Sequence, residues 1–509
     1  MATPINHVFV LMLENRSFDH IFGFSDITGT DAVTGAPTRA NGLDAAAPPA
    51  NPLPGNASVP ASVGDAPFQL SAGNKDPGHE FSNTLVCLCG GGAWSAPNID
   101  ADGRLAGNAY PQAAPGLANS GFVANAVDGG SDAPGLVMRS FSREQLPVLN
   151  ALAREFVLCD AWYSSLPGPT WPNRFFVHAA SSAGLDDSPS NMATAEDFAL
   201  GFDLPNGTIF DRLTSKGLDW KVIEGDAFPQ VLAIKGMTAA EANGHFHDID
   251  HLSEVINDPA FNAAYVFIEP DYDVLHNFQG GNSMHPLGDV RRGEQLIKTV
   301  YETLHASSVW DSSLLVVLFD EHGGFYDHVA PPVATPPGDT QPGSANNRHN
   351  FAFDRLGLRV PCIIASPWVG QNIIDHRPYD HSAIAKTLAN LFDLGAPLTA
   401  RDNAAQGFES LLLNAKRNTP DTLQNPAPGP LAATTATASG ADASTAGFAQ
   451  VALARHLSIT PPAAQQAIVD NFNAAAGQPQ ATAAFLHAAH DAIMQWKQKG
   501  RPAPPATQP

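Results

Sequence analysis

The sequence predicts an α/β protein with a doubly wound, mostly parallel sheet that is covered by helices on both faces. Apolar runs of strand length alternate along the chain with segments of helical spacing, which is typical of strands and helices wound in turn. Several of these runs end abruptly in acids, amides or a hydroxyl. Strands that end in this way are typical of the ligand-binding edge of a parallel sheet.

The composition of the 509 residues limits the class of protein. The chain is long enough for one large domain with additions, or for two to three domains. Its 43 glycines and 43 prolines, with only 15% charged residues, predict long irregular insertions. A formal net charge of −23 argues against nucleic-acid binding, which needs a basic face. No apolar run is long enough to predict a transmembrane segment.

The cysteines do not form the framework of a disulfide-rich fold in a chain of this length: Cys87, Cys89, Cys159 and Cys362. The sequence leaves one or two disulfides open for an exported protein. No secretory signal is visible ahead of the strand expected from residue 7.

The first strong strand is predicted over residues 7–13, a continuous apolar run. Polar residues follow it at once, in the sequence Glu14-Asn15-Arg16-Ser17-Phe18-Asp19-His20. Asn15 or Ser17 can cap a helix that begins here. A helix start also suits an anionic ligand, so a capping role and a binding role are compatible.

A second buried strand is predicted over residues 314–319, and we expect the rest of the chain to be organised around it. Its end carries the sequence Asp320-Glu321-His322-Gly323-Gly324-Phe325-Tyr326-Asp327-His328-Val329. The two glycines let the backbone turn sharply and approach a ligand. An Asp-Glu pair alone is more often part of a solvated loop. The position of this pair directly after a buried strand favours a binding site.

A third polar stretch follows a helix predicted over residues 145–156 and a short strand over 157–160. It has the sequence Gly168-Pro169-Thr170-Trp171-Pro172-Asn173-Arg174. A helix is expected to begin near Asn173. A hydroxyl at a strand-to-helix turn is where several α/β hydrolases place a nucleophile. Thr170 can equally be an N-cap residue, and the spacing leaves both roles open.

The remaining elements complete the alternating pattern. We expect helices over 208–217, 289–305 and 380–392, strands over 220–223, 264–268 and 359–365, and little regular structure over 31–78. Asp380 or Ser382 is expected to cap the helix that ends near residue 392. Two histidines lie in loops, His79 after a Pro-Gly turn and His285 in a Gly-rich stretch.

Three segments are expected along the chain: a main domain over 1–415, a Pro/Ala/Thr-rich linker or wrapped segment over 416–447, and a helical extension over 448–509. Helical spacing in the extension predicts two or three packed helices. We expect the extension to act either as a lid over the site or as a packing element.

The three polar stretches together resemble the bacterial phosphoesterase family, which contains phospholipases C that prefer phosphatidylcholine and related secreted acid phosphatases. The resemblance covers roughly residues 5–412, with three long motifs in the expected order. It implies an alkaline-phosphatase-like fold, and it makes residues 1–415 a phosphoesterase catalytic domain.

The resemblance also implies a role for each motif. The residues expected to hold a divalent metal ion are Glu14, Asn15, Thr170, Asp320 and Glu321. Thr170 is in addition the implied nucleophile, and Asn15 is expected to contact a phosphoryl oxygen. His79 and His285 match the positions that face the phosphoryl oxygens or the leaving group.

Other histidines have less definite roles. His322 follows the acidic pair and is either a partner of the metal ligands or a structural histidine. His245 and His247 lie where the family sometimes has another site histidine, and they do not align securely.

The chemistry of the implied ligands limits the metal and the mechanism. An all-oxygen set favours calcium, magnesium or manganese over zinc, and we expect one ion. A metal bound to the Thr170 oxygen favours the alkoxide and polarises the phosphoryl group. A histidine opposite Thr170 can protonate the departing oxygen and later activate water.

The expected activity is therefore metal-dependent hydrolysis of a phosphate ester, on a phospholipid head group or a small substrate, through a phosphothreonine intermediate as in a phospholipase C. A phosphomonoesterase of the acid phosphatase type is the alternative. A non-catalytic lipid- or surface-binding protein is less favoured because every motif is intact. A sulfatase-like enzyme is also less favoured, because the sequence around Thr170 lacks the Cys/Ser-x-Pro-x-Arg signature. The resemblance implies a secreted or periplasmic protein. Because no secretory signal is visible, a cytoplasmic location stays open. The sequence does not indicate the oligomeric state.

Overall fold

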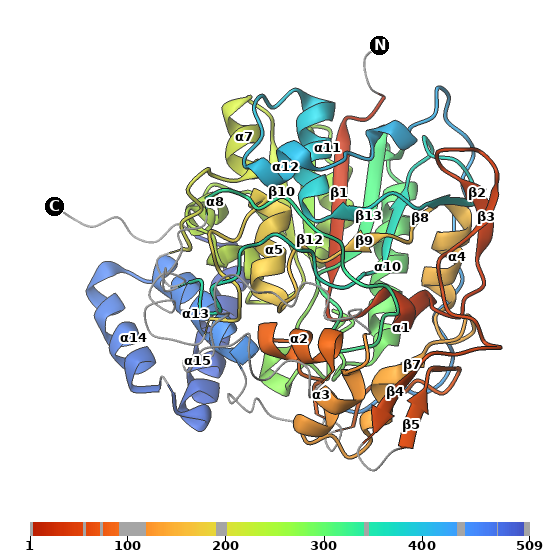
Figure 1. Cartoon of the computed structure of the whole chain (residues 1–509). Helices are drawn as coiled ribbons and strands as arrows, with labels where there is room; N and C mark the ends of the chain where they lie inside the picture. Colours follow the sequence, from red (N-terminus) through yellow and green to blue (C-terminus); the bar gives the residue numbers. More distant parts are fainter. Residues whose placement is uncertain are drawn as a thin grey trace.

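A ten-stranded sheet forms the centre of the computed structural model (Figure 1), which describes residues 4–53, 57–71, 75–90, 119–189, 201–339, 346–434, 443–475 and 477–502. The strand order is β11-β10-β12-β1-β13-β14-β8-β15-β2-β3. In chain order these strands are β1 (His7–Leu13), β2 (Thr28–Asp31), β3 (Pro37–Arg39), β8 (Val157–Cys159), β10 (Trp220–Glu224), β11 (Phe246–Asp248), β12 (Tyr265–Glu269), β13 (Ser313–Phe319), β14 (Cys362–Ala365) and β15 (Ile373–Asp375).

Parallel pairing dominates this sheet. β1 lies between β12 and β13 and is parallel to both. The exceptions are β14, which is antiparallel to β13 and β8, and the antiparallel pair of β2 and β3. Every residue of β1, β12, β13 and β14 is buried, so both faces of the central sheet are covered. The predicted doubly wound, mostly parallel α/β fold is confirmed.

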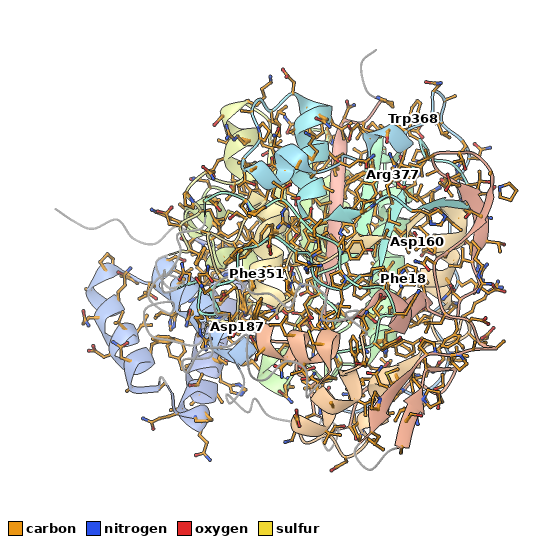
Figure 2. The ribbon with its side chains drawn as sticks, viewed as in Figure 1. Phe18, Asp160, Asp187, Phe351, Trp368 and Arg377 are labelled. Carbon is orange, nitrogen blue, oxygen red and sulfur yellow. The ribbon has the colours of Figure 1, made fainter. Side chains whose placement is uncertain are left out.

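Helices cover the sheet in two groups, on opposite faces (Figure 1). One group contains α4 (Pro147–Glu155), α9 (Leu252–Ile256) and α10 (Val290–His305), and α10 packs against both of the others. The other contains α5 (Thr170–Ala179), α7 (Ile209–Ser215), α11 (Ser382–Phe392) and α12 (Ala400–Ala404). Side chains fill the space between the helices and the strands (Figure 2) and form one continuous apolar core.

Short strands occupy part of the region that was expected to have little regular structure. β4 (Ala50–Leu53) pairs with β5 (Ala57–Pro60), and β6 (Ser62–Val63) pairs with β7 (Arg139–Ser140). The expectation is wrong at these strands, because strand formation depends on the neighbouring partner more than on intrinsic preference. α2 (Phe81–Cys89) and α3 (Phe122–Asp128) pack on each other beside them.

Two predicted helix starts differ from the observed ones. α5 begins at Thr170 and not near Asn173. Pro172 fits inside the first turn because the missing N–H of a proline removes no helical hydrogen bond there. α11 begins at Ser382, and no side chain caps it. The carboxylate of Asp380 is unavailable for capping because it binds Ser165, Ser382 and Arg401.

The C-terminal part of the chain returns to the main domain. Residues 416–434 run along α10, where the hydroxyl of Tyr301 donates to the Pro420 carbonyl at 2.6 Å and Arg291 donates to the Pro430 carbonyl at 2.7 Å. α13 (Ala443–Ser458), α14 (Pro462–Ala475) and α15 (Pro479–Gln498) then pack against one another (Figure 1). α13 also contacts α8 (Met237–Ala242) of the main domain.

The sequence predicted no transmembrane segment and left one or two disulfides open. Within the described ranges, no helix is both long enough and apolar enough to cross a bilayer. The cysteines are all free thiols in the structure: Cys87, Cys89, Cys159 and Cys362.

Candidate active site

The carboxyl ends of β1 and β13 bring two of the three polar stretches together. The strands pair in register up to Leu13 and Phe319, so Glu14-Asn15 and Asp320-Glu321 leave the sheet side by side. The Asn15 N–H donates to Oδ1 of Asp320 at 3.0 Å. Asn15 has a left-handed backbone with φ of 57°, which asparagine adopts more readily than most residues.

Gly323 lets the turn after Glu321 pass close to Asn15. Its φ is 63°, and a Cβ atom built on it would lie 2.1 Å from the Asn15 carbonyl oxygen. Both features require glycine. The Gly323 N–H donates to Oε2 of Glu321 at 2.7 Å and so fixes that carboxylate. The turn therefore holds the two polar stretches against each other.

α5 brings the third polar stretch to the same edge of the sheet. Thr170 is the first residue of this helix and is 4% exposed. Arg174 lies one turn further along, on the same face as Thr170. Its Nε donates to Oδ2 of Asp320 at 3.1 Å, and its Nη2 lies 4.0 Å from Oε1 of Glu14. Because Arg174 binds the acids that follow β1 and β13, Thr170 faces the same edge.

The carboxylates of Glu14, Asp320 and Glu321 are buried at this edge. Burial raises the pKa of Glu14 to about 7, although the charge of Arg174 opposes the shift. Burial also raises the pKa of Asp320, again against the effect of Arg174. One guanidinium does not offset the cost of burying these groups, so a further cation would be needed to hold them ionised.

Some oxygen atoms at this edge lack a hydrogen-bond partner among the residues that the structure describes: Glu14 Oε2, Asn15 Oδ1 and Glu321 Oε1. Buried polar atoms of this kind are costly unless another group binds them. All of them belong to residues expected to hold a metal ion. Carboxylate and amide oxygens are the ligands that calcium, magnesium and manganese prefer, so these residues fit a hard divalent ion.

A second acidic cluster lies beside the site, and its ligand atoms are close enough to hold a metal ion. It consists of Asp19, Asp327 and His328, whose ligand atoms lie within 4.8 Å of one another. The buried guanidinium of Arg359 already binds it, at 2.9 Å from Oδ1 of Asp327 and 2.9 Å from Oδ1 of Asp19. Arg359 thus supplies a positive charge, and the cluster ties α1 (Phe18–Phe22) to the stretch that follows β13.

His79 and His285 reach the site from two loops. His79 Nδ1 donates to the Pro77 carbonyl at 2.8 Å, and its Nε2 lies 3.2 Å from the amide nitrogen of Asn15. Nε2 of His285 lies 3.3 Å from Oδ2 of Asp76. The same Asp76 oxygen lies 3.9 Å from Nδ1 of His79, so one carboxylate joins both histidines.

The carboxylates around His79 raise its pKa. Burial alone would lower the pKa of His79, but the carboxylates of Glu321, Asp76 and Glu80 outweigh it and raise the pKa to about 10. A charged imidazole is suited to contact with a phosphoryl oxygen.

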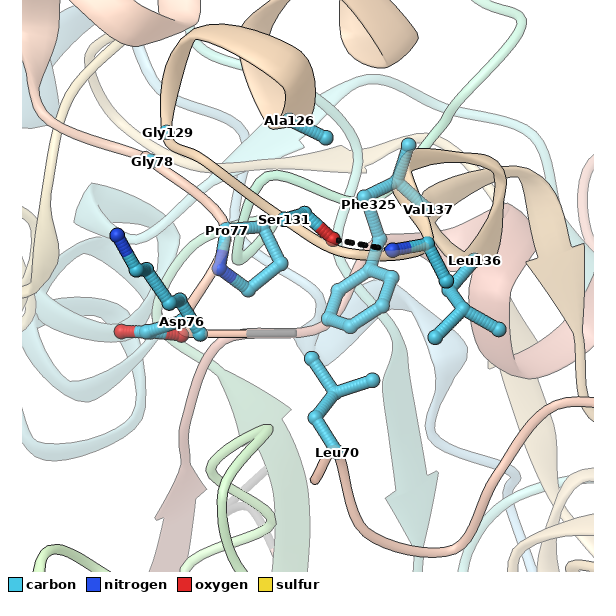
Figure 3. A pocket seen from close by; sticks show the side chains of 12 residues that line it. Leu70, Asp76, Pro77, Gly78, Ala126, Gly129, Ser131, Leu136, Val137 and Phe325 are labelled. Carbon is cyan, nitrogen blue, oxygen red and sulfur yellow. Dashed lines mark hydrogen bonds between the residues drawn. The ribbon is translucent and has the colours of Figure 1, made fainter. Parts of the chain in front are cut away.

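A small, mostly apolar pocket lies beside the loop that carries Asp76 (Figure 3). It is lined in part by Leu70, Val137 and Phe325, with Asp76 at its edge. None of the expected site residues lines this pocket.

Several side chains that support the site were not assigned a role from the sequence: Asp76, Arg174, Gln230, Tyr272 and His381. The Tyr272 hydroxyl donates to Oε2 of Glu269 at 2.6 Å and accepts from Nη1 of Arg174 at 2.9 Å. The sequence does show a strand that ends in an acid at Glu269, and that signal could have placed Glu269 at this edge of the sheet.

Two further supporting contacts come from distant parts of the chain. Nε2 of Gln230 donates to Oε1 of Glu14 at 3.1 Å. Nε2 of His381 donates to the Asp320 carbonyl at 2.6 Å, and the indole of Trp162 donates to its Nδ1 at 3.2 Å. Nothing in the local sequence marks Gln230 or His381, because tertiary packing alone brings them to the site.

The histidines with less definite roles separate into two kinds. Nδ1 of His322 lies 3.1 Å from Oε2 of Glu321, beside the expected metal ligands. His245 and His247 lie at the edge strand β11, which β10 and β12 separate from β1. His245 binds the Trp220 carbonyl at 2.7 Å, so the structure does not bring these two histidines into the site.

Comparison with known proteins defines the class of enzyme. Non-specific phospholipase C3 of Arabidopsis thaliana is 35% identical over 431 residues, which cover 81% of this chain and 74% of the relative. Phospholipase C B of Mycobacterium tuberculosis (strain ATCC 25618 / H37Rv) is 29% identical over 445 residues, covering 80% and 77%. The similarity to these phospholipases C identifies the chain as a phosphoric ester hydrolase. The Phosphoesterase family model matches residues 5–395, and the chain belongs to this family.

A solved structure is also similar to this chain. It is a protein in the alkaline phosphatase superfamily from Vibrio parahaemolyticus, with 16% sequence identity and a TM-score of 0.29. The match covers 52% of this chain and 64% of that chain.

Proposed function

We propose that the chain is a phosphodiesterase of the phospholipase C type that depends on one divalent metal ion and uses Thr170 as its nucleophile. The observation that carries this proposal is the set of unpartnered oxygens on Glu14, Asn15 and Glu321 at the edge of the sheet that Thr170 faces. Calcium, magnesium or manganese suits this set of oxygen ligands better than zinc does.

Each residue of the candidate site has a defined task in the proposed reaction. A bound metal ion would stabilise negative charge on oxygen and polarise the phosphoryl group. The Thr170 hydroxyl loses its proton to solvent, and its oxygen forms a bond to phosphorus while the bond from phosphorus to the leaving oxygen breaks. His79 and His285 are the candidates for the general acid, and one of them gives a proton to the leaving oxygen. Asn15 and His79 are the groups that we expect to donate hydrogen bonds to phosphoryl oxygens.

The second half of the reaction releases the covalent intermediate. The histidine that gave up its proton takes one from water, and the water oxygen attacks phosphorus. The bond between phosphorus and the Thr170 oxygen breaks, and that oxygen takes back a proton from solvent, while the histidine keeps the proton from water for the next turnover. Asp76 holds His285 in orientation throughout, because its carboxylate accepts a hydrogen bond from that imidazole.

The names of the relatives support a phosphodiester substrate for this chain over a phosphomonoester. Both relatives described above are named phospholipases C, and the chain covers about three quarters of each. Hydrolysis of p-nitrophenylphosphorylcholine and of p-nitrophenyl phosphate by the same preparation tests the preference. We expect turnover of the diester to be faster, and faster turnover of the monoester would identify the acid phosphatase alternative.

The same assay tests the nucleophile. Thr170→Ala should abolish turnover, whereas Thr387→Ala is the matched control because it removes a buried threonine hydroxyl from α11. Full activity of Thr170→Ala would overturn the assignment.

Metal dependence has a readout besides activity. Chelation should abolish turnover and lower Tm, and adding back the preferred ion should restore both, since ligand binding to the folded state alone stabilises it by about 2.7 kcal/mol at one hundred times its Kd. Stoichiometric binding of two zinc ions would contradict the proposal. Export to the periplasm or medium stays a prediction, which fractionation of expressing cells would test.

A further inference from the structure

α13 of the C-terminal extension lies directly against the helix that begins with Thr170. The indole of Trp171, the next residue, fills the space beside Gly447, where a Cβ atom would lie 2.3 Å from Cε2 of that ring. Phe448 follows, and it is 1% exposed. Its ring meets the Trp171 ring edge to face, with 5.4 Å between the centroids. The extension is therefore packed against the residue adjacent to the proposed nucleophile.

Phe448 also contacts two other aromatic rings that belong to the site. Its centroid lies 5.2 Å from that of Tyr272 and 6.2 Å from that of Phe278. Phe278 stacks on His285, with 3.8 Å between the centroids and 16° between the planes. Tyr272 is the phenol that accepts a hydrogen bond from Arg174. One side chain thus contacts the first turn of α5, the ring that covers His285 and the phenol that supports Arg174.

A buried ionic cluster fixes the extension in this position. Arg455 of α13 is 0% exposed, and its Nη2 donates to Oε1 of Glu224 at 2.8 Å and binds Glu241. Lys497 and Arg501, in and after α15, reach the same Glu224 oxygen at 2.8 and 2.6 Å. Movement of the extension as a lid would break these buried ion pairs, and breaking such pairs is strongly unfavourable.

We propose that Phe448 is a positioning residue of the active site and that α13 completes the wall that orients His285 and the first turn of α5. Phe448 restrains Phe278, and Phe278 restrains the imidazole of His285. The contact with Trp171 restrains the backbone that carries Thr170. This inference rests on the proposed function, which assigns the roles of Thr170 and His285. It favours a packing element that acts on the site over a lid.

The test compares Phe448→Ala with Phe485→Ala in the full chain. Both changes remove a mostly buried phenylalanine ring from the same group of helices, but the Phe485 ring meets Phe472 edge to face and not a ring of the site. We expect both to lower Tm, and only Phe448→Ala to lower kcat, by about 100-fold with little change in KM, as small displacements of reacting groups do. Phe448→Leu refills much of the volume and should recover most of kcat.

Two further measurements separate positioning from a general loss of packing. The limb of the pH profile of kcat that depends on a histidine should shift in Phe448→Ala and stay unchanged in Phe485→Ala. Gly447→Ala, which keeps the Phe448 ring but forces α13 away from Trp171, should also lower kcat.

The outcomes distinguish this inference from the proposed function. Wild-type kcat and an unshifted pH profile in Phe448→Ala would overturn the inference alone, and so would an equal loss of kcat in Phe485→Ala. Failure of the proposed function would instead appear as full activity of Thr170→Ala.

Discussion

Replacement of Arg359 by methionine tests whether a guanidinium holds the acidic cluster beside the active site. Arg359 is 0% exposed, and its Nε and Nη2 donate to the two Asp327 oxygens at 2.9 and 3.0 Å. Nη2 also donates to Oδ1 of Asp19 at 2.9 Å. Nη1 donates to the Asp160 carbonyl at 2.9 Å, and the guanidinium lies 4.5 Å from the centroid of the Phe18 ring.

The expected magnitude follows from these contacts. Methionine retains an apolar stem but no charge and no donor, so Arg359→Met leaves the buried carboxylates of Asp19 and Asp327 without this cation. Removing one partner of a buried ion pair costs about 3–5 kcal/mol. We expect the free energy of unfolding, measured by urea titration with tryptophan fluorescence, to fall by that amount. Activity should fall as well, because the cluster ties α1 to the stretch that carries Asp320 and Glu321.

Arg39→Met is the matched control. Nε of Arg39 lies 3.6 Å from Oδ1 of Asp26, and both side chains are exposed. A surface ion pair of this kind contributes at most about 1 kcal/mol. Equal losses of stability in Arg359→Met and Arg39→Met would refute the reasoning, because the buried cluster would then need no guanidinium.

Two other predictions concern the extension and the turn after β13. Burial would raise the pKa of Glu224, but Arg455 and the neighbouring cations lower it from 4.5 to about 2. Its folded pKa is thus below the unfolded one, so its contribution to stability is complete above about pH 4.5 and is lost as the pH falls toward 2. Glu224→Gln should flatten this acid dependence of the unfolding midpoint, and an unchanged dependence would count against it. Gly323→Ala should destabilise more than Gly35→Ala: their φ values are 63° and 68°, but only at Gly323 would the Cβ meet another atom, 2.1 Å from the Asn15 oxygen. Left-handed strain alone costs about 1–2 kcal/mol, so equal effects of the two alanines on urea unfolding would contradict the close approach.

Local sequence was sufficient for the central strands β12, β1 and β13 and for the residues that follow β1 and β13. The apolar runs of β1 and β13 are continuous and end at Glu14 and Asp320, and parallel strands deliver their carboxyl ends to one edge. That rule is enough to place Asn15 and Glu321 together. Thr170 is marked by its Pro-rich turn before a helix.

Other parts of the site depend on contacts that no local pattern contains. Asp76 lies in a loop, and only the fold sets it 3.3 Å from His285. Nothing in the local sequence distinguishes Tyr272 and Phe278 from other aromatic residues, and only the fold brings Phe448 of α13 into contact with both. The helical spacing of the extension predicted its helices, but spacing contains no information about the surface on which a helix docks.

The central claim is that Thr170 carries the phosphoryl group during turnover. The most direct measurement is peptide mass spectrometry of the enzyme after an acid quench during hydrolysis of p-nitrophenylphosphorylcholine. The account predicts a phosphorylcholine ester on the peptide that contains Thr170, and no such ester in Thr170→Ala, which should also be inactive. An ester on a different residue, or undiminished turnover by Thr170→Ala, would contradict it.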